Sequence, residues 1–328
     1  MKCKLVSVLC FFCYWLGIDE LFYFLNRKAK RIITFHNILP DDMFRRGVAN
    51  GVSNSLSEFE LIVNECAKRY EFSTDLFDSR TLTITFDDGY RNQYTTAFKY
   101  LHRRSIPAYL FVSGGILPPS RNCPAGDKSL VIDKLLHWVA EAPIEFIPGG
   151  DRLGYWIEEV WPRFIADNGG KGLNLLDELT KRYSYERIVE NLPDNYVCER
   201  LTGIESTELD EMRKSGWKIG WHTKSHYPLS KLNNAELESE VASDAAFRDE
   251  CFSYPYGNLV EVGQDAIAMV RDLGYPCGVS DATKDGEPYS KWFLPRFALL
   301  PNKYRLHFDL SGIEHFIKFR KLLPKVAT

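Results

Sequence analysis

The chain lacks the features that mark several common classes of protein. It has no basic excess, because 41 Lys and Arg residues are balanced by 44 Asp and Glu residues to a net charge of −3. This balance excludes the positively charged footprint of a nucleic-acid-binding protein, so no nucleic-acid partner is expected. It has no long apolar run either: the uncharged stretch at residues 5–18 is shorter than the roughly 20 residues that a membrane-spanning helix needs. The sequence also contains no internal repeat and no low-complexity tract.

Paired cysteine motifs are also scarce. Eight cysteines are scattered along the chain, and only Cys10 and Cys13 have CxxC spacing. No second pair accompanies them, so a zinc or redox motif is not indicated and we expect free thiols that are buried or face lipid. Unpaired cysteines are typical of a reducing compartment, which favours a cytoplasmic location.

Residues 1–30 are apolar and rich in aromatic side chains. Asp19 and Glu20 separate the run at 5–18 from a second run at 21–25, and basic residues flank both runs. A span that continued to residue 25 would bury both acids, and no small-x-small cleavage site follows. We expect an amphipathic helix on a membrane surface, which would place the protein peripherally on the inner membrane. A helix packed on the protein's own core is one alternative. An uncleaved signal anchor, with the domain facing the periplasm or exterior, is another.

The main body alternates between strand-like and helix-like segments, as a parallel α/β fold does. This alternation covers residues 31–115 and 204–315. Residues 116–203 show helical patterns without a clear strand, which predicts a helical insertion after a strand, and residues 316–328 are predicted to form a tail.

One helix start carries a recognisable signal. Residues 57–70 have a helical pattern, and Ser57 with Glu60 three residues later predicts a capping box.

Polar side chains follow several of the predicted strands at the point where each strand ends. They are His36, Asp87, Asp88, His222 and Tyr256. The carboxyl ends of parallel strands hold the functional site in α/β barrels and sheets, so we expect these residues to meet.

Two short segments offer metal ligands. Adjacent carboxylates at Asp87 and Asp88 are costly to hold together unless a cation or proton relieves them. His222 and His226, four residues apart, can turn towards one ion. Taken alone, the first is also compatible with an Asp-Gly turn and the second with two partly exposed histidines. Together they predict a three-ligand metal site with open positions, beside a second aspartate that is free to act as a base.

Three motifs in order give a specific resemblance. The chain reads TFDDGY at Thr85–Tyr90, HTxxH at His222–His226 and FSYPYG at Phe252–Gly257. In these motifs it resembles the polysaccharide deacetylase family (carbohydrate esterase family 4, the NodB homology domain), over residues 31–113 and 204–312. The resemblance implies an irregular parallel (β/α) barrel, resembling a TIM barrel, with a helical insertion.

The resemblance also implies a role for each motif residue. Asp87 would be the general base, and Tyr256, after Pro255, would line the oxyanion site with its backbone N–H. Thr223 would help to hold the histidine loop. The implied ligands of one divalent metal ion, with zinc expected, are Asp88, His222 and His226.

The sequence departs from the family pattern at two positions. Many members have an arginine two residues before the proline of the third motif, where it pairs with the catalytic aspartate, but this chain has Ser253. We expect Arg296 to supply the guanidinium from another strand; a surface role is the alternative. Many members also keep a Leu-x-His motif near the end of the domain. Here His36 resembles the acid of a permuted form of the family and is predicted to be the general acid. His307 is the second choice, and a missing or unidentified acid is the third.

The sequence therefore predicts a metal-dependent hydrolase that removes N-acetyl groups from an amino sugar. The substrate would be a polysaccharide or lipid-linked glycan of the cell envelope. Alternatives are a degenerate glycan-binding protein of the same fold, an N-acyl or amidine hydrolase acting on a small molecule, and a membrane-anchored scaffold. Three tryptophans of the insertion could stack on sugar rings, but packing of the insertion against the barrel is favoured; they are Trp138, Trp156 and Trp161.

Overall fold

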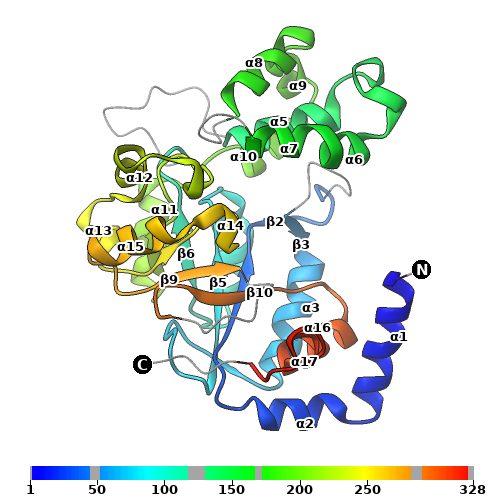
Figure 1. Cartoon of the computed structure of the whole chain (residues 1–328), viewed down its shortest axis with the longest axis vertical. Coiled ribbons are helices and arrows are strands. Elements are labelled where there is room, and N and C mark those ends of the chain that lie inside the picture. Colours follow the sequence, from blue (N-terminus) through cyan, green and yellow to red (C-terminus); the bar gives the residue numbers. More distant parts are fainter. Residues whose placement is uncertain (1, 45–51, 117–129, 167–171, 282–289, 324–328) are drawn as a thin grey trace.

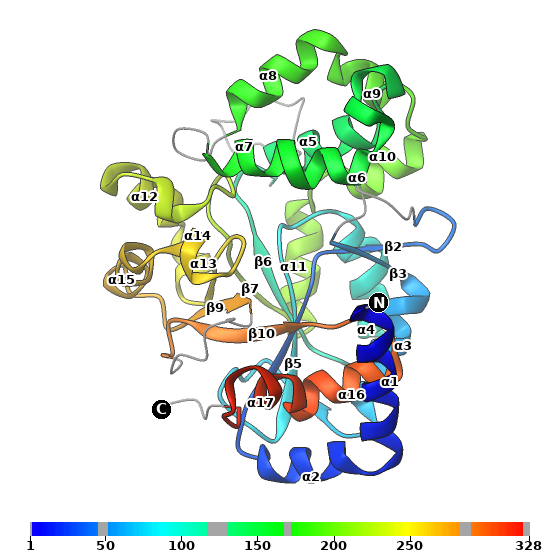
Figure 2. The same ribbon diagram turned by 45° about the vertical axis from the view of Figure 1, so that its right-hand side comes forward.

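The computed structural model describes residues 2–44, 52–116, 130–166, 172–281 and 290–323. Figure 1 shows a central barrel with one group of helices, from residues 131–200, at one end. The helices nearest the two chain termini lie together at the other end, as the rotated view also shows (Figure 2).

The expected irregular parallel barrel is confirmed. Its seven strands run β1, β5, β6, β7, β8, β9 and β10 around the barrel, and β10 pairs with β1 to close it. Every pairing is parallel, and β4 adds to the start of β5 outside the closed ring. The barrel strands and β4 are β1 (Arg31–Phe35), β4 (Glu71–Phe72), β5 (Thr81–Phe86), β6 (Tyr109–Val112), β7 (Lys218–Trp221), β8 (Phe252–Ser253), β9 (Gly278–Asp281) and β10 (Leu294–Ala298). A separate pair consists of β2 (Asn37–Leu39) and β3 (Ser53–Ser55).

Aromatic side chains from β1 and β5 form the centre of the main core. Phe35 stacks on its register partner Phe86 with ring centroids 5.7 Å apart, and Phe86 stacks in turn on Trp217 at 5.4 Å. β1 is buried along its whole length, as expected of a parallel strand covered on both faces. These rings pack between the strands and the outer helices, because Phe59 of α3 (Leu56–Ala67) contacts both Phe35 and Phe86.

Helices cover the outside of the barrel. The capping box of the first of them is formed by Ser55 and Glu58, so the predicted box at Ser57 and Glu60 is wrong by two residues. Ser57 instead donates its backbone N–H to Asp41, at 2.9 Å. These helices are α3 (Leu56–Ala67), the π-helix η2 (Gln93–Phe98), α4 (Lys99–His102), α11 (Ser206–Lys214), α12 (Asn234–Val241), α13 (Ala245–Arg248), α14 (Leu259–Val262) and α15 (Gln264–Asp272).

The segment between β6 and α11 is helical in its described parts, as the sequence predicted. It packs around a core of its own that includes Leu135, Trp138 and Phe164. Trp138 is fully buried there, so it packs within the insertion rather than against the barrel. The helices are α5 (Val131–Glu141), α6 (Arg152–Tyr155), α7 (Trp161–Ala166), α8 (Leu173–Arg182), α9 (Tyr185–Glu190) and α10 (Asp194–Arg200).

Two helices, α1 (Lys2–Trp15) and α2 (Ile18–Leu25), precede the barrel and pack against α16 (Lys303–Ser311). No single helix among the described residues is long and apolar enough to cross a membrane, although the bent pair Val6–Trp15 and Ile18–Leu25 passes together by length and composition. The axes of the pair differ by 81°. The boundary expected after residue 315 falls inside α17, which spans Ile313–Phe319.

Candidate functional site

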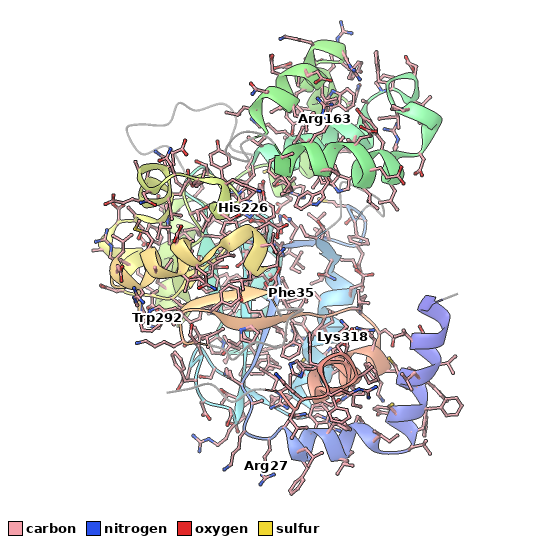
Figure 3. The ribbon with its side chains drawn as sticks, viewed as in Figure 1. Arg27, Phe35, Arg163, His226, Trp292 and Lys318 are labelled. Atoms are coloured by element: carbon pink, nitrogen blue, oxygen red, sulfur yellow. The ribbon has the colours of Figure 1, made fainter. Side chains whose placement is uncertain are left out.

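The residues singled out at strand ends meet at the carboxyl rim of the barrel. His36 follows β1, Asp87 and Asp88 follow β5, and His222 follows β7. Arg296 lies within β10, next to β1 in the closed ring. In Figure 3 the labelled His226 lies where the barrel meets the helices of the insertion.

Three of these side chains form a compact group of metal ligands. One ligand atom from each of Asp88, His222 and His226 lies within 4.8 Å of the other two, and all three residues are buried. Oδ1 of Asp88 is 3.6 Å from Nε2 of His222 and 3.5 Å from Nε2 of His226. Tetrahedral ligands about 2.1 Å from a zinc ion are roughly 3.4 Å apart, so the spacing fits one ion.

The hydrogen bonds of the two histidines leave the same ring nitrogen free in each. Nδ1 of His222 lies 2.8 Å from the carbonyl oxygen of Ser253, which can only accept, so Nδ1 donates and Nε2 keeps its lone pair. Nδ1 of His226 lies 3.2 Å from the hydroxyl of Tyr256, and that hydroxyl donates to the carbonyl of His226 at 3.1 Å. Outer hydrogen bonds of this kind orient metal-binding histidines.

Two buried atoms of the group have no hydrogen-bond partner among the described residues. They are Oδ1 of Asp88 and Nε2 of His222. Buried polar atoms are rarely left unpaired, and both of these face the centre of the ligand group. The donor set therefore fits a divalent cation.

Burial controls the ionisation of the ligands. It raises the pKa of Asp88 to about 7, with the nearby carboxylates of Asp133 and Asp87 adding to the effect. Burial also lowers the pKa of His222 to about 4 and that of His226 to about 3. Both imidazoles are then neutral near pH 7, the form in which histidine binds metal.

The second aspartate is held by an arginine rather than by the ligand group. Nη1 and Nη2 of Arg296 donate to the two oxygens of Asp87 at 2.8 and 2.6 Å, and the hydroxyl of Ser253 donates to Oδ1 at 3.1 Å. Burial alone would raise the pKa of Asp87, but the positive charge of Arg296 outweighs it and holds that pKa well below its usual range. Asp87 is therefore an ionised carboxylate in a fixed orientation.

Of the two histidines considered as the acid, His36 is the one at the site. Its Nε2 lies 3.9 Å from Oδ2 of Asp87, and its side chain is partly exposed. His307 lies on α16, where its Nδ1 is 3.1 Å from the hydroxyl of Tyr23 and its Nε2 is 3.6 Å from Glu65. His307 thus belongs to the packing of α16 against α2 and α3.

Unusual backbone conformations concentrate in the three motifs. Six non-glycine residues of the described chain have positive φ, and four of them are Asp88, Thr223, His226 and Tyr256. Such conformations persist where surrounding contacts enforce them, and they gather at functional sites. At the histidine loop, Oγ1 of Thr223 accepts the backbone N–H of His226 at 3.0 Å. Of the two residues expected at the oxyanion site, Tyr256 lines the cavity at the motif residues. Pro255 is buried and does not line it.

Two polar residues that sequence reasoning missed hold the loops together. Nε2 of Gln93 donates to the carbonyls of His36 and Asp87, and its Oε1 accepts the N–H of Gly89. Oδ1 of Asn92 accepts the N–H of Ile38 at 2.8 Å. Both residues lie just after the first motif, and that position was the only available signal.

The insertion is attached to the barrel through a buried polar cluster, here called the Asp133 cluster: Tyr90, Asp133 and Arg200. Asp133 pairs with Arg200 at 2.6 Å and accepts the hydroxyl of Tyr90. The guanidinium of Arg200 lies 4.9 Å from the ring centroid of Tyr90. Since Tyr90 belongs to the first motif, the cluster joins the insertion to the loop that carries Asp88.

A cavity of about 450 Å³ opens at the motif residues. Asp87, Asp88 and His226 line its barrel side, while α5, the π-helix η5 (Trp156–Val160) and α7 supply an apolar wall that includes Trp156 and Trp161. The favoured packing role for these two tryptophans is therefore incomplete, because they also face the cavity. Trp161 contacts the ring of Tyr256, with centroids 5.7 Å apart.

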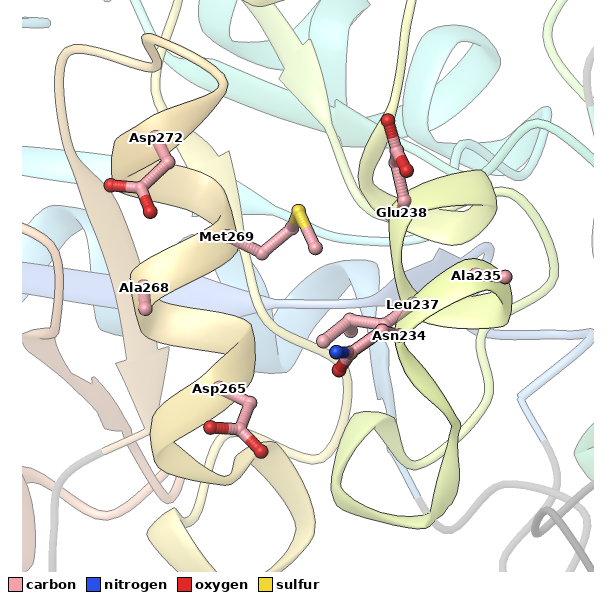
Figure 4. A pocket seen from close by; sticks show the side chains of 8 residues that line it. All are labelled: Asn234, Ala235, Leu237, Glu238, Asp265, Ala268, Met269 and Asp272. Carbon is pink, nitrogen blue, oxygen red and sulfur yellow. The ribbon is translucent and has the colours of Figure 1, made fainter.

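A second hollow lies between α12 and α15, away from the motifs. It is lined by three carboxylates around Met269 and Leu237 (Figure 4). The carboxylates are those of Glu238, Asp265 and Asp272. This hollow contains no histidine, and nothing in its lining marks it as a site.

Comparison with known proteins shows likeness to solved structures only. No family model and no curated protein matches the sequence. A polysaccharide deacetylase from Bacillus cereus is 15% identical, with a TM-score of 0.49 over 86% of this chain and 68% of that one. IcaB from Ammonifex degensii is 15% identical, with a TM-score of 0.48 over 87% and 97%. The deacetylase PplD of Streptococcus pyogenes is 14% identical, with a TM-score of 0.47 over 83% and 93%. At identities this low the likeness concerns the fold alone and says nothing about activity.

Proposed function

We propose that the protein is a metal-dependent hydrolase that removes N-acetyl groups from an amino sugar in a polysaccharide or lipid-linked glycan. One observation carries the proposal: Asp88, His222 and His226 converge within 4.8 Å, and Asp87 lies beside them without joining the group. The three motifs that supply these residues resemble those of polysaccharide deacetylases.

Asp87 is suited to take a proton from the attacking water. Because Arg296 and Ser253 occupy defined positions on its carboxylate, Asp87 stays ionised and cannot rotate. Its Oδ2 lies 3.9 Å from Nε2 of His222, so the base is next to the ligand group. A base held at a fixed distance from a reacting water is the arrangement that general base catalysis needs.

The ligand group is suited to a divalent ion, which we propose to be zinc. Two neutral imidazoles and one carboxylate are a ligand set typical of catalytic zinc. When bound, such an ion supplies Lewis-acid polarisation of a carbonyl and lowers the pKa of water at the site.

His36 is suited to protonate the leaving amine. It lies at the end of β1, the strand that pairs with both β5 and β10, and it lines the cavity. Tyr256 also lines the cavity, and we propose that its backbone N–H donates to the developing oxyanion.

The wall formed by the insertion favours a second candidate, hydrolysis of an N-acyl or amidine bond in a small molecule. The cavity of about 450 Å³ has motif residues on one side and Leu136, Trp156 and Ile157 on the other. A pocket of this size, apolar with a few polar groups, is typical of small-molecule sites. The length of the preferred substrate separates the two candidates.

The test is acetate release from N-acetylglucosamine and from its β-1,4-linked oligomers, by zinc-loaded protein and by Asp87→Asn. We expect release to rise with oligomer length and Asp87→Asn to lose about 10²- to 10⁴-fold of the rate. The variant should retain zinc, measured by elemental analysis, because Asp87 lies outside the ligand group.

Each other result has a definite meaning. Full turnover by Asp87→Asn refutes the base assignment. Zinc binding with glycan binding but without acetate release identifies a degenerate binding protein. A preference for the monosaccharide over every oligomer favours the small-molecule candidate.

A further inference from the structure

The outer face of α1 and α2 exposes an unusual number of large apolar side chains. Leu16 is 71% exposed, Trp15 66% and Phe24 61%. Single exposed apolar residues are ordinary, but contiguous groups mark surfaces that bind a partner or a membrane. We call this set the outer face: Val8, Leu9, Phe11, Phe12, Trp15, Leu16, Leu21, Phe24 and Leu25.

The inner side of the same helices is already packed. Cys10 and Cys13 are buried against Phe308 and Ile313. Nδ2 of Asn26, at the end of α2, donates to the carbonyl of Ser311 at 2.8 Å. The outer face is therefore not the side by which these helices pack on the protein, because a different side of each helix already makes that contact.

The exposed charges that follow α2 are basic, and the exposed carboxylate of α2 is already paired. Glu20 pairs with Arg69, and Asp19 is buried. At the end of α2, Arg27 and Lys28 are exposed. The guanidinium of Arg27 lies 4.4 Å from the ring centroid of Phe24, so a cation and an aromatic ring occupy the same edge.

We propose that the outer face binds the surface of an anionic lipid bilayer, with α1 and α2 lying in the interface. Aromatic rings favour the headgroup boundary, and exposed basic residues at the edge attract anionic headgroups. This charge complementarity favours lipid over a second apolar protein face. A spanning arrangement would require both helices to leave α16 and the 81° bend between them to open.

The fold fixes the direction of the active site relative to such a membrane. α2 ends at Leu25 and β1 begins at Arg31, so α2 lies at the amino-terminal rim of the barrel. The ligand group lies at the carboxyl rim. Figure 3 shows Arg27 at the lower edge of the molecule and His226 well above it, beside the insertion, so the ligand group is remote from the end of α2.

The experiment measures co-sedimentation of the full chain with vesicles of phosphatidylcholine alone or mixed with phosphatidylglycerol. We expect binding to the mixed vesicles. Trp15→Ser combined with Phe24→Ser should weaken binding about tenfold or more, because two large exposed side chains no longer leave water. Arg27→Gln combined with Lys28→Gln should remove most of the preference for the anionic lipid.

Matched controls separate this effect from a general loss of apolar surface. Leu153→Ser combined with Leu173→Ser changes two similarly exposed residues of the insertion and should leave binding unchanged. Thermal unfolding in solution should be unaltered in all three variants, because the substituted side chains are exposed.

Three results would overturn the proposal. One is equal vesicle binding by the wild type and the Trp15→Ser/Phe24→Ser variant. A second is no vesicle binding together with a dimer, seen by analytical ultracentrifugation, that this variant dissociates; this identifies a second copy as the partner. The third is protein that stays with the membrane after alkaline extraction, which identifies a spanning segment.

Discussion

Arg296 and Ser253 both bind the carboxylate of Asp87, the proposed general base. The arginine expected two residues before Pro255 is absent, and the small Ser253 leaves room for a guanidinium that comes from β10. Arg296 binds Asp87 through both oxygens and is itself buried. The partners are 209 positions apart in sequence, and the pairing was expected because Ser253 replaces the usual arginine, not because of any local spacing.

Replacing Arg296 by Met should lower both stability and activity. Asp87 has a folded pKa below its unfolded value, so the pair stabilises the fold above about pH 4, and that contribution is lost as the pH falls through the folded pKa. At pH 7 the variant leaves a buried carboxylate without its charge partner, which costs about 3–5 kcal/mol. Urea unfolding at pH 7 and acetate release measure the two effects.

Arg296→Lys is the matched variant. It keeps the charge but cannot bind both oxygens at once, so we expect partial recovery of stability and less recovery of rate. Equal rates for wild type, Arg296→Met and Arg296→Lys would contradict the role of Arg296 in holding the base.

At the scale of elements, the sequence predicted best what depends on local patterns. The order of strands and helices follows from alternation, and the motif residues could be placed together because each follows a strand. The start of α3 shows the limit. Ser55 and Ser57 each precede an acid by three residues, and the extended backbone of Ser55 decides between them.

Contacts between distant elements could not be predicted in this way. Helical periodicity identified the insertion but contains no information on where it docks. The cavity wall formed by Trp156 and Trp161 and the contact of Asp133 with Tyr90 depend on that docking. The same is true of the packing of His307 against Tyr23, which removes it from the site.

The Asp133 cluster should contribute strongly to the stability of the insertion. Arg200→Met removes the charge partner of Asp133, whose side chain is buried, and should destabilise the protein by about 3–5 kcal/mol. Arg163→Met removes a pair with Glu178 that is exposed on both sides, and should cost no more than about 1 kcal/mol. Urea unfolding of the two variants gives the comparison, and equal losses would show that the cluster contributes nothing special.

On the scale of the whole molecule, the ligand group connects metal binding to stability. Its residues follow β5 and β7 and are buried, so an ion there binds the folded chain far better than the unfolded one. Removing the metal with a chelator should therefore lower the melting temperature by several degrees, and added zinc should restore it. Differential scanning calorimetry measures both changes.

His226→Gln provides the control for that measurement. It removes one of the three ligands, so chelator and zinc should move its melting temperature much less. Zinc uptake by the wild type should also weaken as the pH falls below about 7, where Asp88 takes up a proton, and again below about 4, where protonated imidazoles cannot bind. A chelator response unchanged in His226→Gln would place the ion elsewhere.

The closing strand has a further consequence for how the protein matures. β10 completes the ring between β9 and β1, and it also carries Arg296 to Asp87. During synthesis the amino-terminal part of a chain is made and folds first. A nascent chain that has reached β9 already contains the three proposed metal ligands, but its barrel is still open and Asp87 does not yet have Arg296 as its partner. Closure of the barrel and pairing of Arg296 with Asp87 therefore depend on the same late step, and a polypeptide that ends before β10 has neither.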